Sequence, residues 1–277
     1  MIQEFVIMFR EMLEIVLIIG IILGYLAKTR QTKYNKVVYL GILSAIIASL
    51  MGALMFETMA GGFEGSAEQI FEGTTMLMGA LLMTSMIIWM MKQEHMAEDL
   101  EQKVSVKIEE VNNVGLFMLV FVSIFREGIE IIIFLSAASF ASAGNDIIGA
   151  SLGIVSAIAV GYASFILFMR INLKRFFGIT NIILILFAAG LIVSSAHEFD
   201  EAGIIHPLVE HVWDINPGLN PDGSYPLLHD KGNIGSILKG LFGYTGSPSL
   251  MQVLVWTVYV TAVLIVWRIG NKVHKAG

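Results

Sequence analysis

The sequence predicts an all-α integral membrane protein with seven transmembrane helices, and both composition and segment length point to this class. Of its 277 residues, 56% are hydrophobic and only 14% are charged. The mean hydropathy of +0.77 exceeds what a water-soluble domain can bury in one core. A bilayer crossing needs about 20 predominantly apolar residues. Seven segments are long enough, at roughly residues 4–27, 37–59, 66–91, 113–138, 147–169, 179–199 and 249–267.

Basic residues mark the predicted cytoplasmic side. They follow the first, third, fifth and seventh segments, whereas the connections after the second and fourth segments carry none. These residues are Lys28, Arg30, Lys33, Lys36, Lys92, Lys103, Lys107, Arg170, Lys174, Arg175, Arg268, Lys272 and Lys275. Because cytoplasmic connections carry the excess of Lys and Arg, we expect the amino terminus outside and the carboxyl terminus in the cytoplasm. The protein is predicted to be a multi-pass protein of the inner or plasma membrane.

Two connections have a composition of their own. Residues 200–248 are rich in Gly, Pro, Asp, Asn and His, which predicts an outer loop. Residues 94–113 are charged, with apolar residues at helical spacing, which favours a solvated helix on the cytoplasmic side of the bundle.

A charged motif on the first segment, Phe9 to Glu14, returns on the fourth as Phe125 to Glu130. On a helix, Arg10, Glu11 and Glu14 fall within one arc of about 100°. The predicted topology runs the two motif helices in opposite directions. We therefore expect an inverted repeat, in which the first three helices correspond to the next three and the seventh is appended. The whole chain, residues 1–277, is predicted to form a single permease domain.

The motif charges are too costly to leave unpaired in hydrocarbon. Each costs roughly 2.5 to 3.5 kcal/mol at mid-helix, so six would cost about 15 to 20 kcal/mol, more than the stability of about 5 to 15 kcal/mol of a typical domain. One interpretation is that ion pairs of Arg10 with Glu14, and of Arg126 with Glu130, lock the helices together. Those pairs leave Glu11 and Glu127 without partners. The excess negative charge instead favours a cation in a protein interior or an aqueous path.

The chain contains no cysteine, which excludes thiolate sites and leaves oxygen and imidazole ligands for a metal. Carboxylates are hard donors that suit hard cations. Further acids, Glu64, Glu68 and Glu72, are spaced i, i+4, i+8 at the start of the third segment, and His197, Glu198 and Glu201 end the sixth. Acids at a helix start also suit its positive dipole, which is the alternative interpretation of the first set. Position 201 is Glu, so the zincin pattern H-E-x-x-H is absent.

These features resemble the high-affinity iron permeases of the oxidase-dependent iron transporter family. The resemblance rests on the paired R-E-x-x-E motifs, the acidic third helix from Glu64 to Gly73, and late-loop sequences around Glu201 and Phe242. It implies inward transport of Fe(III), delivered by an extracytoplasmic oxidase or iron-delivery partner. It also implies that the motif glutamates bind the iron. At the position of Met12 the family usually has Gly. The second copy follows the family, because Gly128 occupies the matching position.

We therefore expect an iron permease with no resident cofactor, iron being the transported substrate. Iron would pass from outer-loop acids through Glu68 and Glu72 to the motif glutamates. The predicted metal ligands are Glu11, Glu14, Glu127, Glu130, Glu68 and Glu72, supported by Arg10, Arg126, Glu64, His197, Glu198 and Glu201. A transporter of Mn(II), Zn(II) or Fe(II), and a metal-sensing membrane subunit that does not transport, are the alternatives. An intramembrane enzyme is disfavoured because no nucleophile with a base appears in the sequence. The expected partners are iron ions and membrane lipid, with no nucleic acid.

Overall fold

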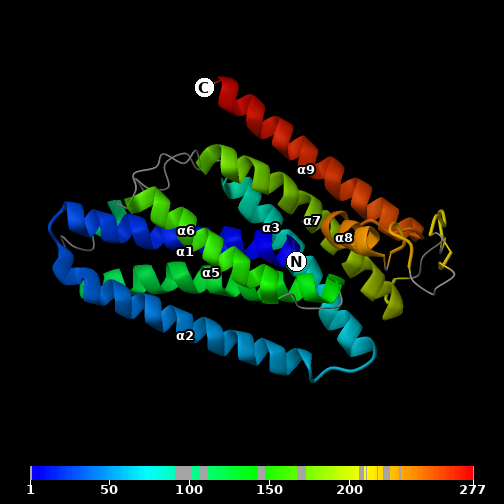
Figure 1. Ribbon diagram of the computed structural model, residues 1–277, viewed down its shortest axis with the longest axis horizontal. Coiled ribbons are helices and arrows are strands. Elements are labelled where there is room, and N and C mark those ends of the chain that lie inside the picture. The colour runs from blue at the N-terminus through cyan, green and yellow to red at the C-terminus, as the bar shows by residue number, and fades with distance from the viewer. Residues whose placement is uncertain are drawn as a thin grey trace. The chain divides into compact units, whose positions relative to one another are not determined.

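The computed structural model describes residues 2–90, 102–106, 112–142, 147–166, 173–205, 209, 211–216, 218–220, 225–230 and 232–276. These residues form helices and no strand, which confirms the predicted all-α class (Figure 1). The helices are α1 (Ile2–Lys28), the short 3-10 helix η1 (Thr32–Tyr34), α2 (Asn35–Ala60), α3 (Ser66–Met90), α5 (Asn113–Ser142), α6 (Ile147–Ile166), α7 (Leu173–Glu201), α8 (Asn233–Phe242) and α9 (Leu250–Ala276).

Seven of these helices lie on the seven predicted segments. The helical runs Thr32–Ala60, Ser66–Trp89 and Thr180–Glu201 are long and apolar enough to cross a membrane, and Ile147–Ala163 and Leu250–Val266 are shorter apolar runs. Helices α1 and α5 are 27 and 30 residues long, but the motif charges interrupt their apolar sequence. The predicted ends at 91 and 169, and most of the predicted helix 94–113, lie outside the described residues.

The predicted outer loop 200–248 contains the ten-residue helix α8, which the sequence interpretation had not identified. Apolar residues one turn apart, such as Ile234 and Leu238, give this short segment an apolar face. Gly243 ends the helix in the left-handed conformation, with φ of 69°, and its N–H caps the carbonyls of Leu238 and Lys239.

The chain packs as two compact units. The first comprises residues 1–59, 93–132 and 146–173, and the second comprises residues 60–92, 133–145 and 174–277. The first unit thus holds α1, α2, α6 and α5 as far as residue 132, and the second unit holds the end of α5 and the third helix of each predicted half, α3 and α7. This division agrees with the predicted repeat, while a single permease domain stays a prediction.

Small residues let the helices of the first unit approach closely. On α6, a Cβ at Gly153 would lie 2.7 Å from the carbonyl oxygen of Phe5, and one at Gly161 would clash with Val16. On α2, a Cβ at Gly41 would lie 3.0 Å from the side chain of Val120 on α5. Figure 1 shows α1 beside α6 and α2 beside α5. Each motif helix is therefore held by a helix of the other predicted half, through small residues that permit close backbone contact.

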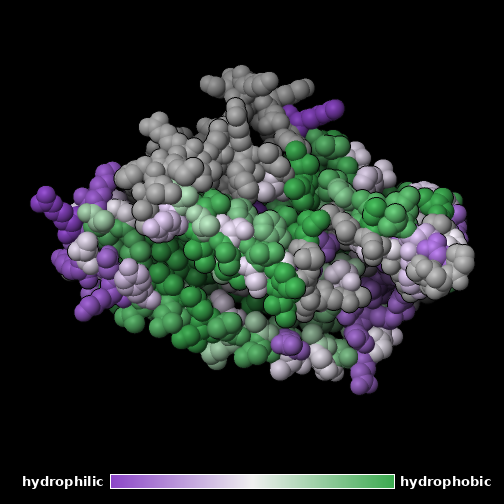
Figure 2. Space-filling view, in the orientation of Figure 1, coloured by the Kyte–Doolittle hydropathy of each residue, from purple (hydrophilic) through white to green (hydrophobic). Residues whose placement is uncertain are grey.

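The outward face of α2 is apolar. Figure 2 shows apolar side chains over the region where α2 lies, and Leu43, Ile47, Leu50 and Leu54 are among the exposed residues of this helix. In water such a continuous apolar surface would be unfavourable, whereas in a bilayer it contacts lipid tails. The surface of α2 therefore supports the assignment to a membrane.

We predict that Gly128→Ala will destabilise the first unit. A Cβ at position 128 would clash with the side chain of Ser49 on α2. Overpacking of this kind costs about 1 to 3 kcal/mol. Thermal unfolding in detergent should show a lower melting temperature for this variant. The double variant Gly128→Ala with Ser49→Gly should recover it, because only the Cα of residue 49 then remains, at 3.9 Å. No recovery in the double variant would contradict this explanation.

Candidate metal-binding site

The first motif forms a buried ion-pair network within α1. The side chain of Arg10 is only 1% exposed. Its Nη1 donates to Oε1 of Glu11 at 2.5 Å, and its Nη2 lies 3.0 Å from Oε1 of Glu14. The planar guanidinium spans both carboxylates because Glu14 lies one helical turn beyond Arg10. One arginine therefore fixes both glutamates of its motif.

The second motif repeats these pairs in a more open setting on α5. Arg126 Nη2 donates to Oε1 of Glu127 at 2.7 Å, and its Nε lies 3.3 Å from Oε1 of Glu130. The side chain of Arg126 is 50% exposed, whereas that of Glu127 is 1% exposed. The two copies therefore share their connectivity and differ in burial.

These pairs correct one step of the sequence interpretation. Glu11 and Glu127 do not lack partners, because each arginine bridges both glutamates of its own motif. The four pairs described above each run within one helix, so they do not themselves lock α1 to α5. The sequence spacing had indicated the pairs one turn apart, but not that the guanidinium reaches its immediate neighbour as well.

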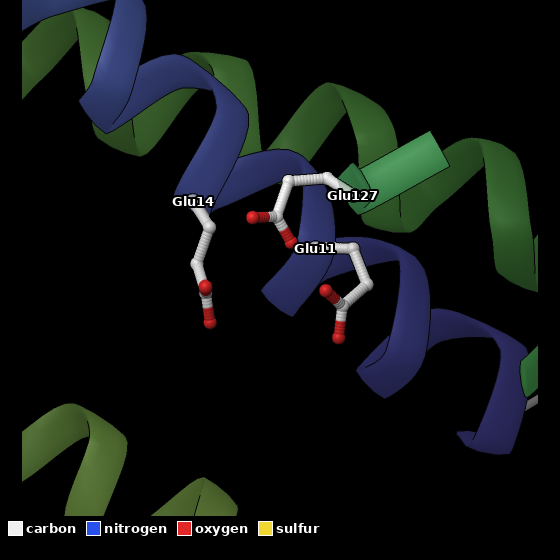
Figure 3. A group of neighbouring side chains, drawn as sticks. All are labelled: Glu11, Glu14 and Glu127. Atoms are coloured by element: carbon white, nitrogen blue, oxygen red, sulfur yellow. The ribbon is translucent and has the colours of Figure 1, made fainter. Parts of the chain in front are cut away.

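Three motif glutamates come together in the first unit. One carboxylate oxygen from each of Glu11, Glu14 and Glu127 lies within 4.8 Å of the other two, and all three residues are buried. Figure 3 shows that Glu11 and Glu14 come from α1 and that Glu127 comes from α5. Ligands on opposite sides of a small hard cation, each at about 2.1 Å, lie about 4.2 Å apart. Small side-chain shifts would therefore bring these oxygens onto one ion.

The fourth motif glutamate, Glu130, is not part of this group. Its Oε1 faces Arg126, and its Oε2 is buried and accepts no hydrogen bond within the described part of the chain. Of the four predicted ligands on the motifs, the structure thus groups three and leaves Glu130 beside them on α5.

The group has unused ligand capacity. Oε2 of Glu11 and Oε2 of Glu127 are buried and accept no hydrogen bond from any described residue. A buried charge without a partner is unfavourable, and a bound cation would satisfy it. The four motif carboxylates and two guanidinium groups carry a net charge of −2 when all are ionised. The arrangement can therefore hold a multivalent cation through oxygen ligands.

The second unit gathers the other predicted acids. Glu198 of α7 interacts electrostatically with Glu68 and Glu72 of α3 and with Glu201. The two helices pack closely at Gly73, where an added Cβ would lie only 2.9 Å from the ring of Phe199. We call these four acids, Glu68, Glu72, Glu198 and Glu201, the second-unit acid group.

Polar contacts hold this group in place, and one predicted residue lies apart from it. Ser195 donates a hydrogen bond of 2.7 Å to the carbonyl of Gly73. Glu201 accepts a bond of 3.2 Å from Gln69 and lies 3.2 Å from Nε2 of His197. Glu64 is exposed in the connection before α3.

The second unit also contains a polar cavity of about 660 Å³ that the sequence interpretation did not identify. Of its charged or titratable lining residues, only His197 was among the predicted site residues. The others are Asp200, His211, Asp230 and Lys239. They are separated by up to 39 positions, so only the polar composition of the loop could have signalled them.

Known proteins resemble the chain over nearly its full length. A sequence profile of the Iron permease FTR1 family matches residues 1–271. The ferrous iron permease EfeU of Shigella sonnei is 30% identical over 98% of this chain and 97% of its own length. An uncharacterized protein of Archaeoglobus fulgidus is 32% identical over 95% of this chain and 93% of its own length. No solved structure matches. The chain therefore belongs to the iron permease FTR1 family, whose function is the transport of iron across a membrane.

Proposed function

We propose that the protein moves iron inward across the inner or plasma membrane and that Fe(III) is bound by Glu11, Glu14 and Glu127. The observation that carries this proposal is the group of three buried carboxylate oxygens within 4.8 Å of one another. Oxygen donors of this kind suit a hard trivalent ion. Arg10 holds two of these carboxylates in position and limits the excess negative charge.

Fe(II) is the second candidate, and two observations favour it. The fully ionised motif residues carry a net charge of −2, which a divalent ion would neutralise. The relative from Shigella sonnei is named a ferrous iron permease. Mn(II) and Zn(II) are the competing ions for such a site, because carboxylates also bind both.

The second-unit acid group has a separate role in this proposal. Its four carboxylates would collect iron from the outside before the motif site selects it. An extracytoplasmic oxidase or iron-delivery protein would supply the ion. Because collection and selection of iron fall to different acids, variants in the second-unit acid group and variants in the motif site should differ in phenotype.

Uptake into proteoliposomes tests the proposal. The purified protein would be offered Fe(III), Fe(II) with a reductant, Mn(II) and Zn(II) in separate experiments, with protein-free vesicles as the control. We expect uptake of iron in preference to Mn(II) and Zn(II). Faster uptake of Fe(III) supports the first candidate and faster uptake of Fe(II) the second. Metal binding without any flux would instead support a sensing subunit.

The direction of transport depends on orientation, which we predict from the basic residues. A tag at the amino terminus and a tag between α7 and α8 should both be labelled by an impermeant reagent added outside intact cells. A tag at Lys275 should be labelled only after the membrane is permeabilised. The reverse labelling pattern would invert the proposed direction.

A further inference from the structure

The cavity of the second unit is lined mainly by polar residues, and none of the motif glutamates is among them. Its volume of about 660 Å³ is within the range of small-molecule sites. Residues from α7, α8, the start of α9 and the connecting segments line it, including the hydroxyl residues Thr245, Ser247 and Ser249. The space is far larger than one dehydrated cation requires.

Some lining residues hold the cavity wall together. Oδ1 of Asp230 accepts a hydrogen bond of 2.7 Å from the N–H of Gly246, and its Oδ2 accepts one of 3.1 Å from Asn216. Nδ1 of His211 lies 2.8 Å from the hydroxyl of Ser247. These contacts join segments distant in sequence, so Asp230 and His211 are structural parts of the wall.

Two lining charges of opposite sign remain for a ligand. Lys239 interacts electrostatically with Glu198 but forms no contact ion pair with another described residue. Asp200 supplies a carboxylate to the same cavity. The second-unit acid group adjoins it through His197, which lines the cavity and lies 3.2 Å from Glu201.

This combination disfavours a simple ion. A bare cation would be repelled by Lys239, and the described residues here offer no three ligand atoms as close together as those of the motif site. A simple anion would face Asp200 and the neighbouring glutamates, which repel it. A ligand that presents a metal on one side and a carboxylate on the other satisfies both charges.

We propose that this cavity binds iron while the iron is still held by a small hydroxycarboxylate chelator. Lys239 and the hydroxyl group of Thr245 bind the free carboxylate of the chelator. Asp200 and His197 face the metal, which passes to the second-unit acid group as the chelator is released. This inference rests on the proposed iron transport and adds the form in which iron arrives.

Binding of doubly labelled ferric citrate to the purified protein tests this proposal. The experiment measures retention of radioactive iron and radioactive citrate by the wild type, Lys239→Gln, Lys239→Arg and the control Lys33→Gln. Lys33 is an exposed lysine on η1 in the first unit. We expect the wild type and Lys33→Gln to retain citrate together with iron. Lys239→Gln should bind citrate about tenfold more weakly, as loss of one charge-assisted hydrogen bond predicts, and Lys239→Arg should restore most of this binding.

Uptake measured in parallel separates this inference from the proposed function. If vesicles accumulate iron but the wild type never retains citrate, the cavity does not bind the chelate and iron transport stands. Equal citrate binding by Lys239→Gln and the wild type also overturns the inference. Competition by metal-free glycine as strong as that by ferric citrate would show a site for zwitterions and would overturn it too. If no form of iron enters the vesicles, the proposed function itself fails.

Discussion

Glu14→Gln and Glu127→Gln will each abolish iron uptake while the protein still inserts and folds. Each substitution keeps the shape of the side chain but removes one ionised oxygen ligand from the group of three buried carboxylates. Loss of an outer partner of a metal ligand already costs about 10- to 100-fold in affinity, so loss of a ligand should cost at least about 100-fold. Initial uptake rates in proteoliposomes, together with equilibrium iron binding by the purified variants, measure this effect.

Two further glutamates make the experiment specific. Glu57 is exposed near the end of α2, so Glu57→Gln should transport iron like the wild type. Glu130 lies outside the group of three, so Glu130→Gln should retain more iron binding than Glu127→Gln. Wild-type uptake by Glu14→Gln would contradict the proposal that the group of three carboxylates binds the transported iron. Equal losses in Glu127→Gln and Glu130→Gln would contradict the exclusion of Glu130 from the binding group.

Much of the fold could be predicted because the bilayer imposes simple constraints on sequence. Hydrocarbon requires long apolar helices, so the seven helical segments follow from hydropathy alone. The motif glutamates could be predicted as a functional site because the same hydrocarbon disfavours charged side chains. Charges such as Arg10 and Glu11 are costly inside an apolar helix unless they have partners there, so their presence signals function.

The features that could not be predicted depend on distances across the fold. Helical spacing placed Glu14 beside Arg10, but it could not show that Glu127 of another helix joins Glu11 and Glu14. The cavity of the second unit likewise depends on contacts such as that of Asp230 with Gly246. The close approach of α2 and α5 had a weak signal in the spacing of Gly41 and Ser49 on one face of α2, which is typical of helix contacts in membranes.

The two arginines share one sequence pattern but should differ sharply when each is replaced by lysine. Arg10 is 1% exposed and spans Glu11 and Glu14, whereas Arg126 is 50% exposed and spans Glu127 and Glu130. Lysine keeps the charge but offers a compact ammonium that cannot bind two carboxylates in a planar fork. At position 126, water can solvate the ammonium group itself, because that side chain is half exposed. At position 10, water cannot solvate the ammonium group in this way, because Arg10 and its two glutamates are buried.

We therefore predict that Arg10→Lys will lower iron uptake by about tenfold or more, since a lost hydrogen bond to a charged group is worth about 1.5 to 3 kcal/mol. Arg126→Lys should lose only about two- to threefold, because Arg126 is half exposed and ion pairs of exposed basic residues contribute about 0.2 to 1 kcal/mol. Iron affinity and maximal uptake rate, measured on the same preparations, check both values. Melting temperatures of the two variants serve as the control for folding. Wild-type uptake by both variants would mean that the arginines act through charge alone. Equal losses at the two positions would mean that the difference in burial between the two copies has no part in holding the ligands.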